Sequence, residues 1–252
     1  MISPLAHIDP NAKIGNGVTI DPFVVIGGNV TIGDGSHIMS NAVIDSNTII
    51  GKNCRVFPGA VVGAIPQDLK FVGEETIVEI GDNTTIRECV TINRGTKDKW
   101  KTVIGSNCLL MAYSHVAHDC ILGNNVILGN AVQLAGHVTV DDYAIMSGMA
   151  GAHQFTRIGE HTYVAGHTVV RKDVPPFIKA AREPLSYMGI NIVGLQRRGF
   201  SRETINEISS IYHNLFVEKN TTSVAMGIIE KKFDSSPIKE QILGFINQSR
   251  TG

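Results

Sequence analysis

The sequence has little of what a charged, helical or disulfide-stapled protein needs. Of the 252 residues only 18% are charged and 6% are aromatic, and there is a single tryptophan. The four cysteines (Cys54, Cys89, Cys108, Cys120) form no C-x-x-C pair, which argues against a zinc knuckle or a redox motif. No apolar run approaches a membrane span, and the first residues lack the basic and apolar segments of a signal peptide. We therefore expect a cytoplasmic protein with free thiols and no integral membrane segment.

Neither sign of charge dominates the chain. The 22 Lys and Arg residues nearly balance the 23 Asp and Glu residues, so nothing favours a nucleic-acid partner. The charges are nevertheless unevenly placed. Residues 151–202 carry eight bases and three acids, whereas residues 1–92 carry five bases and ten acids. A basic end is what electrostatic steering of an acidic partner would require.

A six-residue period runs through two thirds of the chain. Counting in sixes from Ile2 to Val62 gives Ile or Val at eleven consecutive positions, and 26 of the 29 positions up to Val170 are apolar. Four residues after each large aliphatic residue comes a small one, and this position includes Cys54, Cys108 and Cys120. Each hexapeptide then supplies one strand and one turn, and three of them close a coil. The pattern predicts a parallel β-helix of triangular cross-section with these cysteines in its core.

The period is interrupted twice and then ends. Asp68, Glu74 and Asp98 break it, which predicts inserted loops near residues 64–77 and 96–102. After the proline-rich DVPPF segment, apolar residues recur with helical spacing from Ser201 onward and again after Ser236-Pro237. We expect a mainly β domain over residues 1–187 and a small α-helical C-terminal domain over residues 188–252.

Histidines gather in the middle third of the chain. One coil is eighteen residues, so His118, His137 and His153 should lie within one residue of register on adjacent coils, with His115 close by. Such a column predicts a functional face, since an unperturbed imidazole titrates near neutral pH.

Seven strings occur in order along nearly the whole chain: PQDLK, VTINRGT, HVAHDC, LAGHV, HQF, DVPP and GINIVGLQRRGFSRE. Taken together they resemble the UDP-N-acetylglucosamine acyltransferase family of left-handed β-helix enzymes. The resemblance implies a homotrimer with active sites between subunits. It also implies transfer of an (R)-3-hydroxyacyl chain from acyl carrier protein to the 3-hydroxyl of UDP-N-acetylglucosamine, the first step of lipid A biosynthesis, without a metal or other cofactor.

The resemblance also assigns roles to individual residues. His118 matches the general base, Asp119 the carboxylate that orients it, and Gly136 the backbone N–H of an oxyanion hole. The acyl-length ruler falls at Gly166 and His167, where the glycine implies a relatively long chain. The remaining matches are to residues that hold the UDP-sugar, namely Asp68, Lys70, His115, His137, His153, Gln154, Asn191, Arg197 and Arg198.

Two departures from the family pattern and several alternatives stand beside this interpretation. Asn93 replaces a histidine and cannot titrate, and Val193 replaces an acidic residue that would contact uridine. Asp119 would otherwise be a turn carboxylate, and Arg197-Arg198 a solvated pair at a helix start. The acceptor could instead be a 3-amino sugar. A related UDP-acylglucosamine N-acyltransferase is disfavoured because its extra N-terminal domain has no counterpart before Ile2.

Two further classes remain as alternatives. A β-helix carbonic anhydrase would bring three histidines, here His115, His118 and His137, onto zinc across a subunit boundary. A purely structural β-helix would have no reason to break its period with PQDLK or to gather histidines and arginines toward one end.

Overall fold

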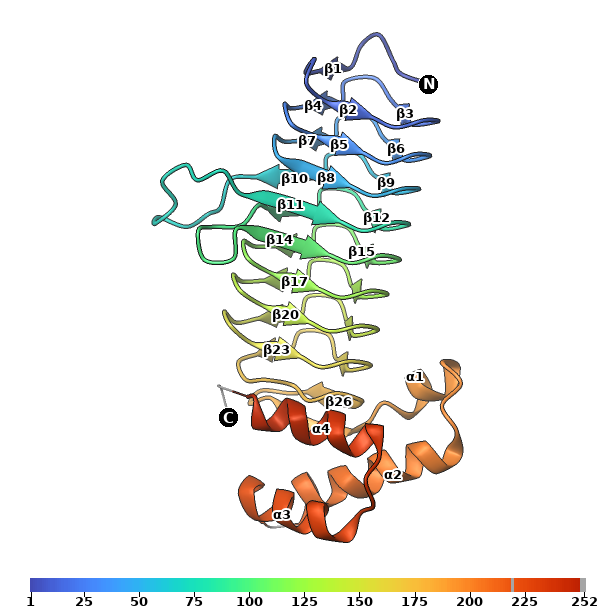
Figure 1. Ribbon diagram of the computed structural model, residues 1–252, viewed down its shortest axis with the longest axis vertical. Coiled ribbons are helices and arrows are strands. Elements are labelled where there is room, and N and C mark those ends of the chain that lie inside the picture. Colours follow the sequence, from blue (N-terminus) through green and yellow to red (C-terminus); the bar gives the residue numbers. More distant parts are fainter. Residues whose placement is uncertain (219, 250–252) are drawn as a thin grey trace.

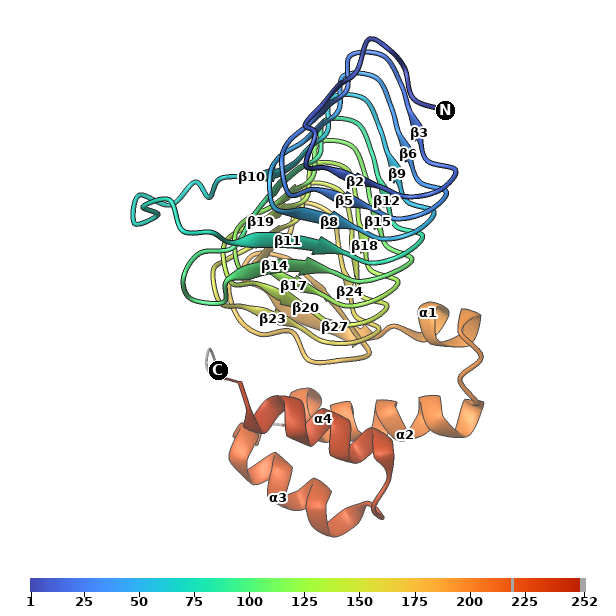
Figure 2. The same ribbon diagram turned by 45° about the horizontal axis from the view of Figure 1, so that its top comes forward.

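Three β-sheets form the sides of a triangular prism in the computed structural model, which describes residues 1–218 and 220–249 (Figures 1 and 2). All strand pairs are parallel except the last pair of the ten-stranded sheet. Where no loop is inserted between them, strands pair with strands eighteen residues later, for example Val25 with Val43 and Leu109 with Ile127. In Figure 1 the front strands run from left to right while the chain descends from its N-terminal end, so the coil is left-handed. The expected left-handed β-helix of hexapeptide repeats is confirmed.

Up to Val170 each sheet takes every third strand of the chain, and two later strands extend the ten-stranded sheet. The nine-stranded sheet contains β1 (His7–Ile8), β4 (Val25–Ile26), β7 (Val43–Ile44), β10 (Val61–Ala64), β13 (Thr91–Asn93), β16 (His115–Val116), β19 (Gln133–Leu134), β22 (Gly151–Ala152) and β25 (Val169–Val170). The eight-stranded sheet contains β2 (Lys13–Ile14), β5 (Thr31–Ile32), β8 (Thr48–Ile50), β11 (Ile77–Ile80), β14 (Lys101–Ile104), β17 (Ile121–Leu122), β20 (Thr139–Val140) and β23 (Arg157–Ile158). The ten-stranded sheet contains β3 (Thr19–Ile20), β6 (His37–Ile38), β9 (Arg55–Val56), β12 (Thr85–Ile86), β15 (Leu109–Leu110), β18 (Ile127–Leu128), β21 (Ile145–Met146), β24 (Tyr163–Val164), β26 (Ile178–Ala181) and β27 (Ser186–Ile190).

The interior of the prism is filled by the two inward positions of each hexapeptide. From Ile20 to Val170 the large aliphatic residues of the period are almost fully buried. Cys54, Cys108 and Cys120 are buried at the small position, as expected, whereas Cys89 is exposed. Burial raises the pKa of the Cys108 thiol to about 11 and that of Cys120 to about 12, so these thiols are packing residues.

The turns between sheets impose their own sequence requirement. The third residue of many turns has a positive φ, which asparagine tolerates better than most residues. The second residue often accepts a hydrogen bond from the coil before it, as when Asn124 N donates to Asp142 Oδ1 at 2.7 Å. Turn chemistry and the apolar period therefore specify the same coil.

We name the three corners of the prism by a residue that each contains. The His118 corner joins the nine-stranded to the eight-stranded sheet and includes residues 117–119, 135–137 and 153–155. The His161 corner joins the eight-stranded to the ten-stranded sheet and includes residues 141–143 and 159–161. The Gly166 corner joins the ten-stranded to the nine-stranded sheet and includes residues 147–149 and 165–167.

Two loops interrupt the coils where the period breaks. The first, residues 65–76, leaves the prism after β10 and projects furthest from it, and the second, residues 94–100, follows β13 (Figures 1 and 2). Strand pairing resumes in phase on both sides, since Val61 pairs with Thr91 and Thr85 with Leu109. Because both loops leave the nine-stranded sheet, they emerge on the same edge as the His118 corner.

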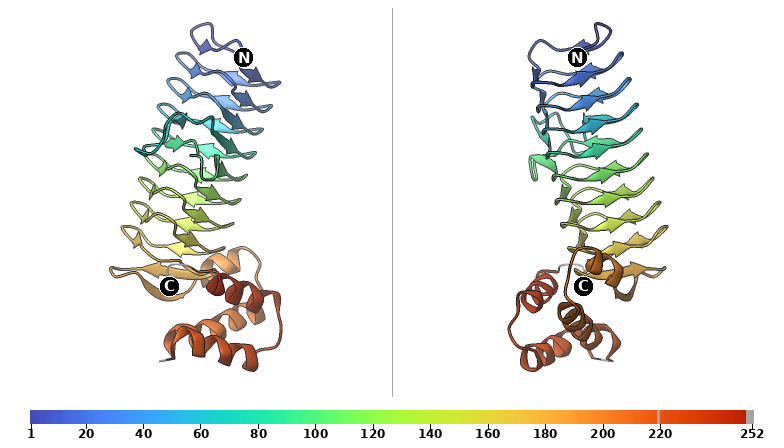
Figure 3. Two further views of the ribbon diagram at one scale, coloured as in Figure 1. Left: turned by 60° about the vertical axis from the view of Figure 1, so that its left-hand side comes forward. Right: turned by 90° about the vertical axis from the view of Figure 1, so that its right-hand side faces the viewer.

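Helices cover the C-terminal end of the prism (Figure 3). They are α1 (Ile192–Arg197), α2 (Arg202–Tyr212), a π-helical turn (His213–Val217), α3 (Thr222–Lys232) and α4 (Pro237–Asn247). Ser201 and Ser236 cap α2 and α4 as expected, and Pro237 opens α4. β27 crosses the predicted boundary between residues 187 and 188, and residues 250–252 of the predicted helical domain lie outside the described residues. No helix in the described part of the chain has the length and apolar character needed to cross a membrane.

Candidate active site

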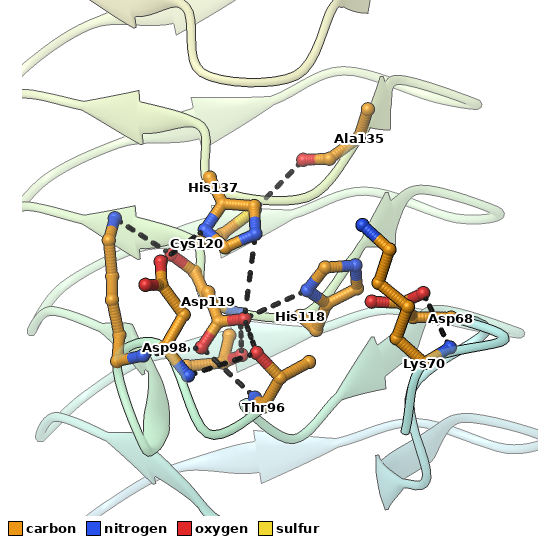
Figure 4. A network of polar contacts seen from close by, with 11 residues as sticks. Asp68, Lys70, Thr96, Asp98, His118, Asp119, Cys120, Ala135 and His137 are labelled. Carbon is orange, nitrogen blue, oxygen red and sulfur yellow. Dashed lines mark hydrogen bonds and ion pairs between the residues drawn. The ribbon is translucent and has the colours of Figure 1, made fainter.

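The His118 corner holds the histidine and carboxylate that the sequence singled out. His118 follows β16, and its Nδ1 lies 2.9 Å from Asp119 Oδ2 (Figure 4). An ionised carboxylate accepts the Nδ1 hydrogen, which leaves the lone pair on Nε2. The side chain is 10% exposed, so the ring is held but not sealed off. This is the state in which an imidazole can remove a proton from a hydroxyl group.

Asp119 is far more than a turn carboxylate. Its side chain is fully buried, and its backbone has a positive φ at the third position of the turn. Oδ1 accepts hydrogen bonds from the backbone N–H of Thr96 at 3.0 Å and Lys99 at 3.2 Å, and Oδ2 accepts one from Thr96 Oγ1 at 2.6 Å. Burial alone would raise the pKa of the carboxyl, but the hydrogen bonds from Thr96 and His118 hold that pKa below its ordinary value.

Apart from His118, the groups that donate to the Asp119 carboxylate come from the second inserted loop. Thr96, Asp98 and Lys99 were not identified from the sequence as site residues. The only signal in the sequence was the break in the six-residue period at Asp98, which marked the loop without indicating its contacts. The loop folds against the coil that carries Asp119, so its N–H groups point at the buried carboxylate.

His137 stands beside His118 on the next coil. The two rings meet edge to face with centroids 5.1 Å apart, and His137 Nε2 lies 3.8 Å from Asp119 Oδ2. Asp98 Oδ2 lies 3.1 Å from His137 Nδ1, but this contact lacks hydrogen-bond geometry. Burial outweighs these carboxylates and keeps the pKa of His137 below its ordinary value.

The expected histidine column is right for its first two members and wrong for the third. The ring that stacks on His137 is Phe155, with centroids 4.5 Å apart. His153 lies two residues earlier, is exposed, and has its Nδ1 3.3 Å from the carbonyl oxygen of the neighbouring Gln154. The eighteen-residue coil places Phe155 in register with His137, and the shorter spacing to His153 moves that residue out of the stack.

His115 lies on β16 just before this corner. Thr91 Oγ1 is 2.7 Å from its Nδ1, and burial, with the nearby His118, lowers its pKa. His115 is therefore neutral at physiological pH and fixed by its neighbour on the preceding coil.

Gly136 occupies the place directly over the His118 ring. A Cβ built on Gly136 would lie 2.6 Å from Cε1 and 2.7 Å from Nε2 of His118, so only glycine fits there without moving the imidazole. At this turn position Asn16 N and Asn124 N each donate to an aspartate of the next coil.

The equivalent residue of the coil after Gly136 is Gln154, and within residues 1–218 and 220–249 the Gly136 N–H has no hydrogen-bond partner. An N–H in this arrangement is able to stabilise an oxyanion close to His118.

The first inserted loop carries the predicted sugar contacts. Lys70 N donates to Asp68 Oδ1 at 3.0 Å, and Figure 4 shows these two residues on the loop near the His118 network. The buried Asn93 donates from Nδ2 to the carbonyl of Ile65 at 3.1 Å and so holds the start of the loop. Asn93 thus has a structural contact in place of the proton chemistry that a histidine could supply.

The remaining predicted residues lie on the other two corners. Gly166 and His167 are exposed at the Gly166 corner. Asn191 caps α1 at the His161 corner, accepting from Gly194 N at 3.2 Å and donating to the His161 carbonyl at 2.9 Å. The alternative of a solvated Arg197-Arg198 pair at a helix start does not hold, because Arg197 lies in the last turn of α1 and Arg198 follows it.

Both arginines have distinct environments. Arg198 donates to the carbonyls of Gly194 and Tyr143, and burial lowers its pKa, whereas Arg197 is exposed. One chain therefore distributes the predicted base, acyl and nucleotide residues over three different edges of the prism.

One group of side chains in the described residues has the spacing of a metal site. The ligand atoms of His118, Asp119 and His137 lie within 4.8 Å of one another. Both oxygens of Asp119 already accept hydrogen bonds from the second loop, which a metal ion would have to displace. The group holds two histidines and a carboxylate, and His115 is bonded to Thr91 instead, so it does not match the three-histidine zinc site of the carbonic anhydrase alternative.

Comparisons with known proteins agree on one family. A family model described as "Udp N-acetylglucosamine O-acyltransferase; Domain 2" matches residues 173–252, and a model of bacterial transferase hexapeptide repeats matches residues 11–46, 29–64 and 101–136. The acyl-(acyl-carrier-protein)–UDP-N-acetylglucosamine O-acyltransferase of Aliivibrio fischeri strain MJ11 is 50% identical over 100% of this chain and 96% of its own. That of Alkalilimnicola ehrlichii is 49% identical over 100% and 98%.

Solved structures give the same result. The UDP-N-acetylglucosamine acyltransferase of Bacteroides fragilis is 51% identical with a TM-score of 0.99, covering 100% of this chain and 99% of that one. The enzyme of Francisella novicida is 41% identical with a TM-score of 0.97, covering 100% and 93%.

Proposed function

Because the chain belongs to the UDP-N-acetylglucosamine O-acyltransferase family, we propose that it moves an (R)-3-hydroxyacyl chain from acyl carrier protein to the 3-hydroxyl of UDP-N-acetylglucosamine. This is the first step of lipid A biosynthesis and takes place in the cytoplasm. The observation that carries the proposal is the His118 corner, where an imidazole oriented by Asp119 lies against Gly136, whose N–H has no hydrogen-bond partner among the described residues.

The chemistry follows from that geometry. His118 Nε2 takes the proton of the 3-hydroxyl while the sugar oxygen attacks the thioester carbonyl, and the new C–O bond turns the carbonyl oxygen into an oxyanion. The Gly136 N–H donates to this oxyanion. The C–S bond then breaks, and the carrier thiolate leaves with the proton returned by the imidazolium. Asp119 keeps Nδ1 protonated throughout and stabilises the transient positive charge.

The acceptor sugar is held from the His118 corner. Asp68 and Lys70 of the first loop and Gln154 of the coil after Gly136 contact the glucosamine, with His115, His137 and His153 completing the binding surface. Their shared edge of the prism supports this placement. His137 is neutral at physiological pH because of its lowered pKa, so it donates or accepts hydrogen bonds without adding charge beside the base.

The nucleotide and the acyl chain are met by the other corners. Arg197 and Arg198 grip the diphosphate, and Asn191 lies beside the base of the nucleotide. Gly166 lies under the acyl chain. A Cβ at this position would stand 3.0 Å from the Gly148 carbonyl oxygen, so the turn leaves little room for a larger side chain. By the family resemblance, a larger residue here would shorten the acyl chain that fits.

A homotrimer brings the three corners together. Residues that serve one reaction lie on separate edges of a single prism, so a complete site needs edges from neighbouring copies. The outer face of the ten-stranded sheet supports such contacts because it carries Leu109, Ile127 and Ile145, and the adjoining corner exposes Tyr113 and Met149.

A transfer assay tests the proposal. Native protein is compared with His118→Ala on UDP-N-acetylglucosamine and its 3-amino analogue, using carrier protein loaded with (R)-3-hydroxyacyl chains of increasing length. A matched control is His37→Ala, because His37 Nε2 lies 3.0 Å from Asp21 Oδ2 in a histidine–carboxylate pair far along the prism. We expect transfer to the hydroxyl sugar with a long chain, a loss of about 10²-fold or more in His118→Ala, and none in His37→Ala.

The alternatives give other results in the same assay. Transfer confined to the 3-amino sugar would identify the amino-sugar variant. Transfer only to a UDP-acylglucosamine amine would identify the N-acyltransferase. Full activity in His118→Ala would contradict the assignment of the base.

A further inference from the structure

Three rings stack on one another at the His161 corner, away from the proposed base. Tyr143 and His161 lie nearly parallel with centroids 4.8 Å apart, and Phe177 continues the stack at 5.8 Å. All three residues have positive φ, from 56° to 68°, a conformation that is unfavourable for bulky side chains. His161 is only 5% exposed although it is polar. The repeat supplies this positive-φ turn position on coil after coil, and here it carries three rings that form one continuous stack.

The segment that carries the two arginines docks on this ring stack. At its start, the Asn191 side chain donates to the His161 carbonyl at 2.9 Å. At its end, Arg198 donates to the Tyr143 carbonyl at 3.2 Å, and the Phe200 ring meets the edge of His161 at 5.0 Å. Helix α1 between them has six residues, too few to hold its shape without tertiary contacts. The ring stack therefore fixes where α1 and its arginines point.

The orientation of the His161 ring is set in turn by Glu160. Glu160 Oε1 lies 3.0 Å from His161 Nε2, and Oε2 accepts a hydrogen bond from Gln241 of α4. The hydrogen bond between Glu160 and His161 is the main reason that the pKa of Glu160 is lowered. One carboxylate thus connects the ring under α1 with the helical domain.

We infer that Glu160 and His161 are positioning residues for the nucleotide end of the acceptor: they hold the ring stack that aims Arg197 and Arg198 at the diphosphate, without touching the substrate. The inference rests on the proposed diphosphate contact of these arginines. It predicts a selective effect, because a misaimed α1 weakens binding of UDP-N-acetylglucosamine while the base at the His118 corner keeps its geometry.

Steady-state kinetics of the full-length protein test this. His161→Ala removes the ring, His161→Phe keeps the stack, and Glu160→Gln keeps the shape but removes the charge. The control Ser249→Ala breaks another contact between the C-terminal segment and the coils, the 2.8 Å hydrogen bond from Ser249 Oγ to Asp173 Oδ2. We expect His161→Ala to raise the KM for the UDP-sugar about tenfold and Glu160→Gln about threefold. Neither kcat nor the KM for acyl carrier protein should change more than about twofold, His161→Phe should recover most of the loss, and Ser249→Ala should behave as native.

Arg197→Ala separates the two ideas. A rise in KM for the UDP-sugar in Arg197→Ala, without one in His161→Ala and Glu160→Gln, overturns the positioning role alone. No rise in any of the three overturns the proposed diphosphate contact and the positioning role with it. A fall in kcat together with a rise in the KM values for both substrates in His161→Ala also overturns the inference, because it would show a general structural defect. If His161→Ala does not fold, the comparison of Glu160→Gln with Ser249→Ala decides.

Discussion

Replacing Gly136 by alanine perturbs the base and the oxyanion site with a single methyl group. The added Cβ would lie 2.6 Å from His118 Cε1, whereas ordinary contact begins near 3.4 Å, so the imidazole must move by about 0.8 Å. A displacement of about 1 Å in a catalytic group costs roughly 10²-fold in rate. We expect Gly136→Ala to lower kcat about 10²-fold, with a much smaller change in either KM.

Gly28→Ala is the matched control for this experiment. Gly28 has the same turn position on the same edge of the prism, and its added Cβ would lie 3.5 Å from the nearest atoms of Asp9, an ordinary contact. Neither glycine has a positive φ, so neither alanine strains the backbone.

Initial rates of acyl transfer at varied concentrations of each substrate give kcat and KM, and thermal unfolding shows whether both variants fold as well as the native protein. The reasoning would be refuted by Gly136→Ala with native kcat, or by an equal loss in Gly28→Ala.

Five other measurements follow from the same structure. Asp119→Asn should lower kcat by about 10²-fold or more, because an amide cannot balance the positive charge on His118 during transfer; an unchanged kcat would contradict the role of Asp119. The pKa of Asp119 is lowered in the folded chain, so its ionised carboxylate contributes stability at pH values above the ordinary pKa of about 3.9. This stability is lost as the pH falls through the lower pKa of the folded chain. The thermal unfolding midpoint should therefore fall less steeply with decreasing pH in Asp119→Asn than in the native protein. A thiol reagent should react rapidly with Cys89 only, since Cys54, Cys108 and Cys120 are buried with raised pKa values, and rapid labelling of all four would contradict the core. Protein purified without added metal should contain far less than one zinc per chain by elemental analysis, and one zinc per chain would favour the carbonic anhydrase alternative. Light scattering should give a mass three times the 27.2 kDa of one chain.

The prism could be derived from the sequence because its order is local. Each hexapeptide specifies its own strand, its inward residues and its turn, and the repeat of eighteen residues leaves one way to stack the coils. The same local logic located Ser201 and Ser236 as helix caps. Local sequence patterns were not sufficient after Val170, where the repeat ends. No local pattern predicted β26 and β27 as further strands of the ten-stranded sheet, or α1 as a helix.

The site was only half derivable. Counting coils placed His118 and His137 side by side, because these positions follow from the repeat. Gly136 came from the family resemblance, and the structure places it directly over the His118 ring. The counting gave no access to the second loop, whose Thr96 and Lys99 hold Asp119. Only the tertiary structure decided that Phe155 completes the ring stack, that Arg198 binds the Tyr143 carbonyl, and that the predicted residues occupy three edges. The sequence determines what repeats every six residues, whereas loops and corners depend on contacts between residues far apart in the chain, which no periodicity encodes.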